Sequence, residues 1–367
     1  MPHRIADLYD GSAAIEAEIA SREPDTTDYW DQVRSTVDTY HPKRLHLRVS
    51  EVIPETASSA TFRLRDAGEE PLPPFLAGQY VNLFVDGTSR PYAISSSPAD
   101  REHYDLTVRR VPGGRVSNLL LDTEWDEATT TGPMGTFYYN PLFHGDDVVF
   151  IAGGSGVAPA MSMIRDIQDN NLARRFHLIY GSRTSDDVIF REELDRAVEG
   201  VRVDHVIGDL ITADVIRDLA GELDGRMVYV CGPQAMYPFT LAELGRLGHP
   251  RHRIRFEANG APSDPAAQGN WPTGCDPTQE VTVTTREGSF RTPRNRPLLD
   301  ALEDHGITPE TACRSGECSL CRVRVVKGED FARSFLEGLK KNNARTYPNN
   351  LAALQAVANK EIDVAFL

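Results

Sequence analysis

The chain has 367 residues, of which 40% are hydrophobic and 25% charged, as is typical of a globular protein with two or three domains. Its net charge of −15 argues against nucleic-acid or anionic-membrane partners, and no apolar run approaches the roughly 18 residues of a membrane span. Three of the five cysteines fall within nine residues, which favours metal ligation in a reducing compartment over a disulfide framework. We therefore expect a cytoplasmic protein, and the acidic N-terminal stretch does not predict a signal peptide.

The first part of the chain predicts a helical extension followed by an antiparallel β-barrel. Residues 1–43 are polar with spaced apolar residues, which indicates one or two helices. Between 44 and 140, six short period-two runs bounded by Gly, Pro and Asp predict six strands. The segment 113–122, "GGRVSNLLLD", changes from glycines to a helical pattern and predicts one helix that caps the barrel.

The second part predicts a parallel sheet and a small third domain. Residues 141–257 alternate apolar strands with helices, one of them expected at 186–199, which is typical of a doubly wound α/β domain. A Gly/Pro-rich linker covers 258–278. From 279 to 367 we expect a small α+β domain, with a hairpin at 280–293, a helix at 297–307 and a strand at 321–328.

One glycine-rich segment, "AGGSGVAPAM" (152–161), joins a predicted buried strand to a helix. Bare backbone at Gly153, Gly154 and Gly156 lets N–H groups approach a pyrophosphate at the positive end of the helix dipole. The alternative is a tight turn that needs glycine for its dihedral angles. This segment is a candidate dinucleotide site.

Two other strand ends fall at the same predicted sheet edge, where open α/β folds bind ligands. Ser182 and Arg183 follow the next strand, where a ribose is recognised and a 2′-phosphate could be accepted, although Arg183 is equally well a surface arginine. Cys231 ends a later strand in "VCGPQAM", and its alternative is a small buried core residue.

The barrel carries its own motifs. "RPYAISSSP" (90–98) places Arg90, which can hold a phosphate bidentately, and Tyr92, which can stack on a planar ring, on one face of a strand. The alternative is a packed surface pair. "PGGRVSN" (112–118) puts glycines at a helix start with Ser117 in the first turn, which is a second phosphate cradle.

A third motif, "ACRSGECSLC", has the spacing C-x4-C-x2-C. This spacing opens a plant-type [2Fe–2S] site, which needs four thiolates, here Cys313, Cys318, Cys321 and one more. No cysteine follows Cys321, and Cys275 precedes the first strand of the domain. We therefore predict that these three cysteines do not hold a stable cluster.

In this order, the motifs resemble the ferredoxin–NADP reductase superfamily, and most of all its phthalate-dioxygenase-reductase branch, over roughly residues 45–328. The resemblance implies a flavin-binding barrel, an NAD(P) domain and a C-terminal ferredoxin-like β-grasp domain with a [2Fe–2S] cluster. Its implied flavin contacts are Arg90, Pro91, Tyr92, Ala93, Ser96, Gly114 and Ser117. Its implied nucleotide contacts are Gly153, Gly154, Gly156, Pro159, Ser182, Arg183, Gly232 and Pro233.

The resemblance also implies catalytic roles for Cys231, beside the nicotinamide, and Tyr92, and metal ligation by Cys313, Cys318 and Cys321. Ala93 departs from the pattern, because the family has Ser or Thr there, and this predicts a weakened hydride step. Residues 330–367 instead resemble a segment of iron(III)-type periplasmic substrate-binding proteins. That tail indicates either a chimeric or misjoined chain, or a ferredoxin tail that diverged after cluster loss.

The expected function is electron transfer from NAD(P)H through a flavin, and in the family design a [2Fe–2S] cluster, to a partner oxygenase or demethylase component. FAD is favoured, FMN stays open, and so does the choice between NADH and NADPH. One alternative is a flavin-only NAD(P)H diaphorase with a cluster-less ferredoxin domain. Another is a non-catalytic protein whose tail serves iron binding or interaction, which the intact flavin and nucleotide motifs argue against.

Overall fold

The computed structural model describes residues 31–33, 35–37, 44–123, 125–196, 198–257, 260, 264–267, 271–309, 311–315 and 321. Residues 31–33 and 35–37 are helical, as expected for part of the extension. The rest of that extension, residues 322–328 of the expected strand and the tail 330–367 lie outside the described residues, and Cys321 is in a turn. None of the helices in the described ranges is long and apolar enough to cross a membrane.

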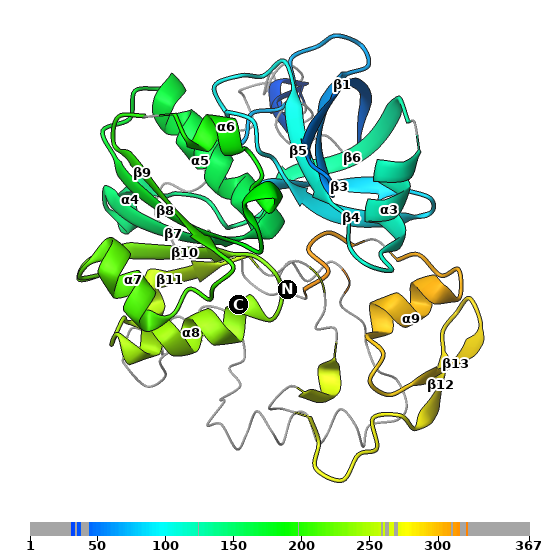
Figure 1. The fold of residues 1–367 in the computed structure, drawn as a ribbon. Coiled ribbons are helices and arrows are strands. Elements are labelled where there is room, and N and C mark those ends of the chain that lie inside the picture. Colours follow the sequence, from blue (N-terminus) through cyan, green and yellow to red (C-terminus); the bar gives the residue numbers. More distant parts are fainter. Residues whose placement is uncertain are drawn as a thin grey trace, which may run out of the picture.

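The six predicted strands form one antiparallel sheet (Figure 1). They are β1 (Leu45–Thr56), β2 (Ser59–Asp66), β3 (Tyr80–Val85), β4 (Thr88–Ala93), β5 (Tyr104–Arg109) and β6 (Glu127–Met134). Their order is β4-β3-β6-β1-β2-β5, and a bridge between Ile94 and Leu106 joins the two outer strands into a barrel. The predicted helix is α3 (Arg115–Asp122), which buries Val116 and Leu120 against the barrel core.

The second unit is a parallel sheet of order β11-β10-β7-β8-β9. Its strands are β7 (Asp147–Gly153), β8 (Arg175–Ser182), β9 (Val201–Ile207), β10 (Met227–Cys231) and β11 (Ile254–Phe256), and α4 (Pro141–His144) leads into it. The helix α5 (Ala158–Asp169) packs on one face, and α7 (Ala213–Ala220) and α8 (Met236–Arg246) pack on the other. Helices on both faces confirm the doubly wound prediction.

The single helix expected at 186–199 is wrong. The chain instead forms a 3-10 turn (Ser185–Asp187), an extended stretch and the four-residue helix α6 (Arg191–Leu194). Val188, Ile189 and Phe190 are all buried, whereas a helix would point consecutive side chains in directions about 100° apart. Phe190 completes the turn at φ = 59°, in the left-handed region, which a continuous helix excludes.

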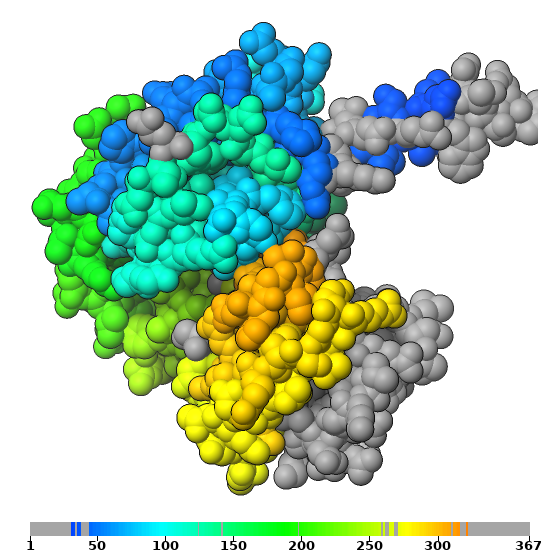
Figure 2. Space-filling view, turned by 90° about the vertical axis from the view of Figure 1, so that its right-hand side faces the viewer, coloured from blue at the N-terminus to red at the C-terminus, as the bar shows by residue number. Residues whose placement is uncertain are grey.

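The third unit contains the expected hairpin, β12 (Glu280–Thr284) and β13 (Ser289–Pro293), and helix α9 (Leu298–Asp304). Phe290, Ala301 and Leu302 form its small apolar cluster. Residue Thr311 ties this unit to the barrel, because its carbonyl accepts from Asn82 Nδ2 at 2.6 Å and its hydroxyl lies 3.0 Å from that of Ser89. Figure 2 shows the orange segment, which includes α9, lying against the cyan strands of the barrel.

Candidate functional site

The glycine turn of the nucleotide domain lies at the carboxyl end of the parallel sheet. Gly153 ends β7, and Gly154 adopts φ = 55°, in the region that favours glycine. A Cβ at Gly156 would lie 2.2 Å from the carbonyl oxygen of Cys231. The sequence therefore needs glycine at 156 because two ligand-facing loops touch there. We call residues 153–157 the nucleotide turn.

The nucleotide turn contains a 3-10 helix, Gly154–Val157, that leads directly into α5, and the Ala158 N–H donates to the Ser155 carbonyl. No side chain caps α5, its first turn has no acidic residue, and Pro159 lies buried in that turn. By contrast, α7 is capped by the Thr212 side chain and carries Asp214 in its first turn. The helical start therefore lies at Gly154, where no side chain caps the 3-10 helix and its first turn has no acid, and its positive dipole end fits an anionic group such as a pyrophosphate.

The barrel helix α3 begins in the same way. Gly114 is its N-cap residue, no side chain caps it, and its first turn has no acidic residue. A Cβ at Gly114 would lie 2.7 Å from Ser117 Oγ, while Gly113 adopts φ = 70° with open space around it. The Ser117 hydroxyl accepts from the backbone N–H of Val111 at 3.2 Å and so holds the loop in shape. This helix start fits a flavin phosphate.

Cys231 ends β10 at the sheet edge, as predicted, and Gly232 and Pro233 follow it beside Gly153. Its thiol is buried and donates to the carboxylate of Glu257 across 4.0 Å. Burial raises the pKa of the Cys231 thiol well above its usual value, and the Glu257 charge raises it further. Cys231 is therefore a protonated thiol at neutral pH, suited to packing beside a ligand rather than to nucleophilic attack.

Arg90, Pro91, Tyr92 and Ala93 lie on β4, and Arg90 is fixed by one of its nitrogens. Nη1 donates to the Thr88 hydroxyl and the Ser89 carbonyl, both at 2.7 Å, and pairs with Glu303 of α9 at 3.4 Å. Within the described part of the chain, no hydrogen bond involves its Nε and Nη2 edge. Burial, followed by the nearby Arg314, lowers the pKa of Arg90. The open edge has the geometry for bidentate phosphate binding.

Two further predicted flavin contacts, Tyr92 and Ser96, already contact other parts of the barrel. Burial raises the pKa of Tyr92, which stays a neutral phenol packed against the barrel core. Ser96 is buried, accepts from the Asp105 N–H at 3.2 Å, and donates to the His103 carbonyl at 3.4 Å. Its hydroxyl thus holds the end of the flavin strand, which we define as residues 88–96.

Ser182 and Arg183 occupy the end of β8 as predicted. Ser182 is buried, whereas Arg183 is exposed and has no ion-pair partner among the described residues. Arg183 is therefore available to a charged ligand at the sheet edge.

Two of the three predicted metal ligands can be located. Cys313 is buried against Tyr80 and Ala312, Cys321 is half-buried, and Cys318 lies outside the described residues. The two remaining cysteines of the chain lie in the nucleotide domain (Cys231) and in the linker (Cys275). This donor set provides three thiolates and does not fit a [2Fe–2S] cluster that needs four.

The sequence analysis missed several residues that shape the site. Arg109 at the end of β5 places Nη1 2.7 Å from where a Cβ of Gly154 would stand, and it pairs with Asp187 at 3.2 Å. Its position after "LTV", at a strand end just before the predicted phosphate cradle, was the only available signal. No sequence pattern pointed to Glu257 or Glu303, because their partners Cys231 and Arg90 lie 26 and 213 residues away in the chain.

Three family models match the chain in the order of its domains. They are an oxidoreductase FAD-binding domain at residues 46–139, an oxidoreductase NAD-binding domain at 150–241 and a 2Fe-2S iron-sulfur cluster binding domain at 281–352. The last match runs past Gly328, and the tail resemblance to periplasmic binding proteins stays a prediction. The FAD-binding and NAD-binding domains define an NAD(P)H-dependent flavin oxidoreductase.

Similar proteins narrow the class. The phthalate dioxygenase reductase of Burkholderia cepacia is 30% identical over 73% of this chain and 82% of its own length. The ferredoxin reductase component of the 3-ketosteroid-9-alpha-monooxygenase of Mycolicibacterium smegmatis is 30% identical over 87% of this chain and 88% of its own. A solved phthalate dioxygenase reductase structure matches with a TM-score of 0.61 and 29% identity, over 78% of this chain and 88% of that one. The chain belongs to the phthalate-dioxygenase-reductase branch of the ferredoxin reductase family.

Proposed function

We propose that this chain is the reductase component of an oxygenase system, which takes hydride from NAD(P)H at the edge of the parallel sheet and passes electrons to a protein acceptor. A bound flavin supplies the exchange between two-electron and one-electron transfer. The observation that carries the proposal is the glycine-rich start of α3 and of the helical segment formed by Gly154–Val157 and α5, neither of which has a side-chain cap or an acid in its first turn. The named oxygenase systems of the relatives support a protein acceptor.

In this proposal each predicted residue has one task. Arg90 and the α3 start hold flavin phosphate, Tyr92 packs on the flavin ring, and the α5 start holds nucleotide pyrophosphate. The protonated Cys231 thiol lies beside the nicotinamide as an uncharged wall. We propose FAD as the flavin, supported by the family model of the barrel.

The test is a visible spectrum of the purified protein, chromatography of the extracted flavin and an anaerobic titration with NADH and NADPH. We expect a yellow protein that bleaches with at least one coenzyme. A colourless chain that cannot be reconstituted with FAD or FMN would contradict the proposal. Repeating the titration with Arg183→Ala separates the coenzymes, because loss of NADPH use at unchanged NADH use would identify Arg183 as the 2′-phosphate ligand.

The three-thiolate donor set favours a second candidate function, a flavin-only diaphorase. The two candidates differ in their acceptors. A diaphorase reduces two-electron dyes and quinones rapidly but an oxygenase component or cytochrome c slowly. We also propose a cytoplasmic location, supported by the clustered cysteine spacing, which is typical of metal ligation in a reducing compartment; none of the described cysteines, Cys231, Cys275, Cys313 and Cys321, forms a disulfide.

A further inference from the structure

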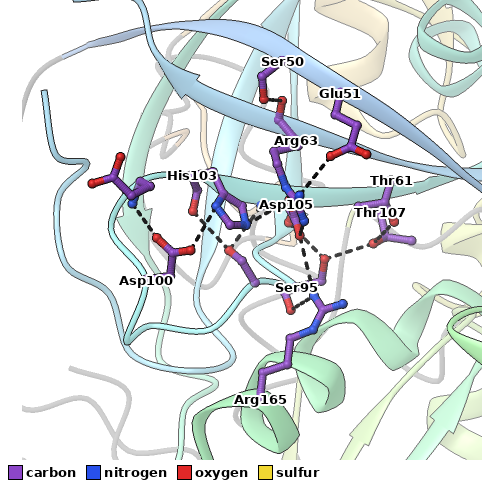
Figure 3. Close-up of polar contacts among 12 residues, drawn as sticks. Ser50, Glu51, Thr61, Arg63, Ser95, Asp100, His103, Asp105, Thr107 and Arg165 are labelled. Carbon is purple, nitrogen blue, oxygen red and sulfur yellow. Dashed lines mark hydrogen bonds and ion pairs between the residues drawn. The ribbon is translucent and has the colours of Figure 1, made fainter. Parts of the chain in front are cut away.

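One face of α5 donates two hydrogen bonds to the end of the flavin strand. Arg165 Nη1 donates to the Ser95 carbonyl at 2.7 Å, and Ser162 Oγ donates to the Ser96 carbonyl at 2.8 Å. Ser162 and Arg165 are three positions apart on the helix and therefore share a face. The same face of one helix thus binds two consecutive carbonyl groups of the barrel (Figure 3 shows the contact of Arg165).

Arg165 is oriented by further contacts within its own domain. Its Nε and Nη2 form a bidentate pair with the Glu193 carboxylate at 2.8 and 2.7 Å. Its guanidinium lies over the Phe190 ring at 5.2 Å, and its side chain is only 19% exposed. With two nitrogens fixed in this way, Nη1 has one direction left, toward the barrel.

The barrel side of the contact is equally fixed. Asp105 lies under Arg165, with 3.7 Å between its carboxylate and Nη1, and it holds Arg63 bidentately at 2.9 and 3.0 Å (Figure 3). The Ser95 hydroxyl donates to the backbone carbonyl of Asp105 and lies within hydrogen-bond distance of the Thr107 hydroxyl, both at 3.1 Å. These contacts fix the Ser95 carbonyl within the barrel, so a shift of α5 would break its hydrogen bond with Arg165. The Arg165–Ser95 contact is therefore a reference point for the relative position of the two domains.

This reference point lies between the two cofactor-binding segments. Helix α5 begins directly after the nucleotide turn, and Arg165 is seven residues, about 10 Å, along it. Ser95 follows Tyr92, the predicted flavin-stacking residue, by three positions. A shift of α5 along the barrel would therefore move the nucleotide turn relative to the flavin strand.

We propose that Arg165 and Ser162 are positioning residues that set the separation between nicotinamide and flavin, an inference that rests on the proposed function. Hydride transfer needs its reacting atoms about 3–3.5 Å apart, and a misplacement of 1 Å costs on the order of 100-fold in rate. Neither residue lies in the predicted flavin or nucleotide contacts. Their loss should slow the hydride step and leave the affinity of each cofactor unchanged.

The experiment compares Arg165→Met with Arg174→Met. Arg174 is a matched control, because it is 17% exposed, pairs with Asp166 of the same helix and stacks on Tyr139, and has no contact with the flavin strand. For Arg165→Met we expect flavin reduction at saturating NAD(P)H to slow 10- to 100-fold, with the nucleotide Kd within threefold. The long-wavelength charge-transfer absorbance of the flavin–nicotinamide complex should fall as well, since it reports ring overlap rather than turnover.

Arg174→Met should keep both the rate and the band within twofold. A rate within twofold of wild type in Arg165→Met, or an equal loss in both variants, would overturn the inference. Ser162→Ala keeps the test decisive if Arg165→Met loses its flavin. This substitution removes one hydroxyl and should slow flavin reduction about threefold at full flavin content. An unchanged rate would contradict the inference. Wild-type protein that neither coenzyme reduces would instead refute the proposed function.

Discussion

The nucleotide turn and the cysteine loop, residues 311–321, are both short segments that resemble cofactor-binding motifs of the family, and they are built differently. The nucleotide turn works through backbone, and its glycines are enforced by contacts such as that of Gly156 with the Cys231 carbonyl. The cysteine loop works through side chains: it supplies three thiolates, and no cysteine after Cys321 supplies the fourth that the cluster needs. A backbone site is fixed by the fold, whereas a side-chain site fails when one ligand is missing.

The described first part of the cysteine loop, residues 311–315, nevertheless lies against the barrel. Thr311 bonds to Asn82 and Ser89, and Cys313 packs against Tyr80. Arg314, with φ = 56°, is buried between Asp300 at 2.8 Å and Glu303 at 2.5 Å. Docking and metal binding are therefore separate properties of this loop.

Iron content tests this comparison with the largest expected effect. We expect far fewer than two irons and two labile sulfides per chain after anaerobic reconstitution, because one iron would have a single protein thiolate. The measurement is iron and sulfide analysis, with low-temperature EPR of the reduced protein. Close to two irons with a rhombic signal would show that an unrecognised fourth ligand completes the site.

Substitution of the nucleotide turn should break the other half of the comparison. Gly156→Ala places a Cβ 2.2 Å from the Cys231 carbonyl, so one of the two loops must move. We expect nucleotide affinity to fall more than 100-fold while flavin content stays near wild type. Gly245→Ala in α8 is the control, because nothing lies within 4 Å of its Cβ position. Normal nucleotide binding in Gly156→Ala would contradict the predicted position of the ligand.

The flavin site combines both kinds of construction, a helix start and one arginine. Arg90→Ala removes a bidentate phosphate partner whose charge-assisted hydrogen bonds are each worth about 1.5–3 kcal/mol. Because two such bonds are lost, we expect flavin affinity to fall at least about 100-fold, measured by reconstitution of the flavin-free protein. Riboflavin, which has no phosphate, should bind both proteins equally, and an equal loss for riboflavin would mean that Arg90 acts only on the fold.

The buried carboxylate of Asp105 stabilises the barrel through its charge. We therefore predict that the stability of the protein falls in acid. Burial alone would raise the pKa of Asp105, but hydrogen bonds from His103 and Arg63 outweigh it and lower the pKa to about 2. A lowered folded-state pKa stabilises the protein above the unfolded value and loses that stabilisation as pH falls from about 4 to 2. We expect about 2 kcal/mol to be lost in this window by denaturant unfolding. Asp105→Asn should lack this part of the pH dependence, and parallel pH curves for the two proteins would contradict it.

The substitution Cys231→Ala has the smallest expected effect of these tests. In the proposed function the thiol fills space beside the nicotinamide and carries no charge at neutral pH, so we expect about tenfold slower flavin reduction at an unchanged nucleotide Kd. Stopped-flow reduction under anaerobic conditions measures both quantities. Cys231→Ser restores a similar volume and should recover part of the rate, and an unchanged rate in the alanine variant would remove Cys231 from the hydride step.

Local patterns predicted most of the fold. Period-two runs located all six barrel strands, and glycine followed by a helical pattern located α3 and α5. The helix predicted at 186–199 was wrong because the burial of three consecutive apolar residues, 188–190, outweighs the helical periodicity of the segment. The short strand β11 was not predicted either, since its three residues are too few for a periodic signal.

The site was predictable where a motif is contiguous and not where partners meet across domains. Gly153, Cys231 and Ser117 stand at the strand and helix ends where the sequence put them. The pairs Arg165–Ser95 and Arg90–Glu303 join residues 70 and 213 positions apart, so no local pattern contains them. Such contacts depend on how domains pack, and one sequence carries no period or spacing that reports it.

The carboxylate of Glu303 has a consequence for engineering. Together with Arg314 it serves the third domain, but it also accepts from Thr88 at 2.8 Å and pairs with Arg90 in the barrel. A designer who exchanges this domain for a complete ferredoxin, to restore one-electron output, would separate Arg90 from its partner. A transplanted module therefore needs an acidic residue at the position equivalent to Glu303, so that the graft boundary follows this ion pair rather than the linker.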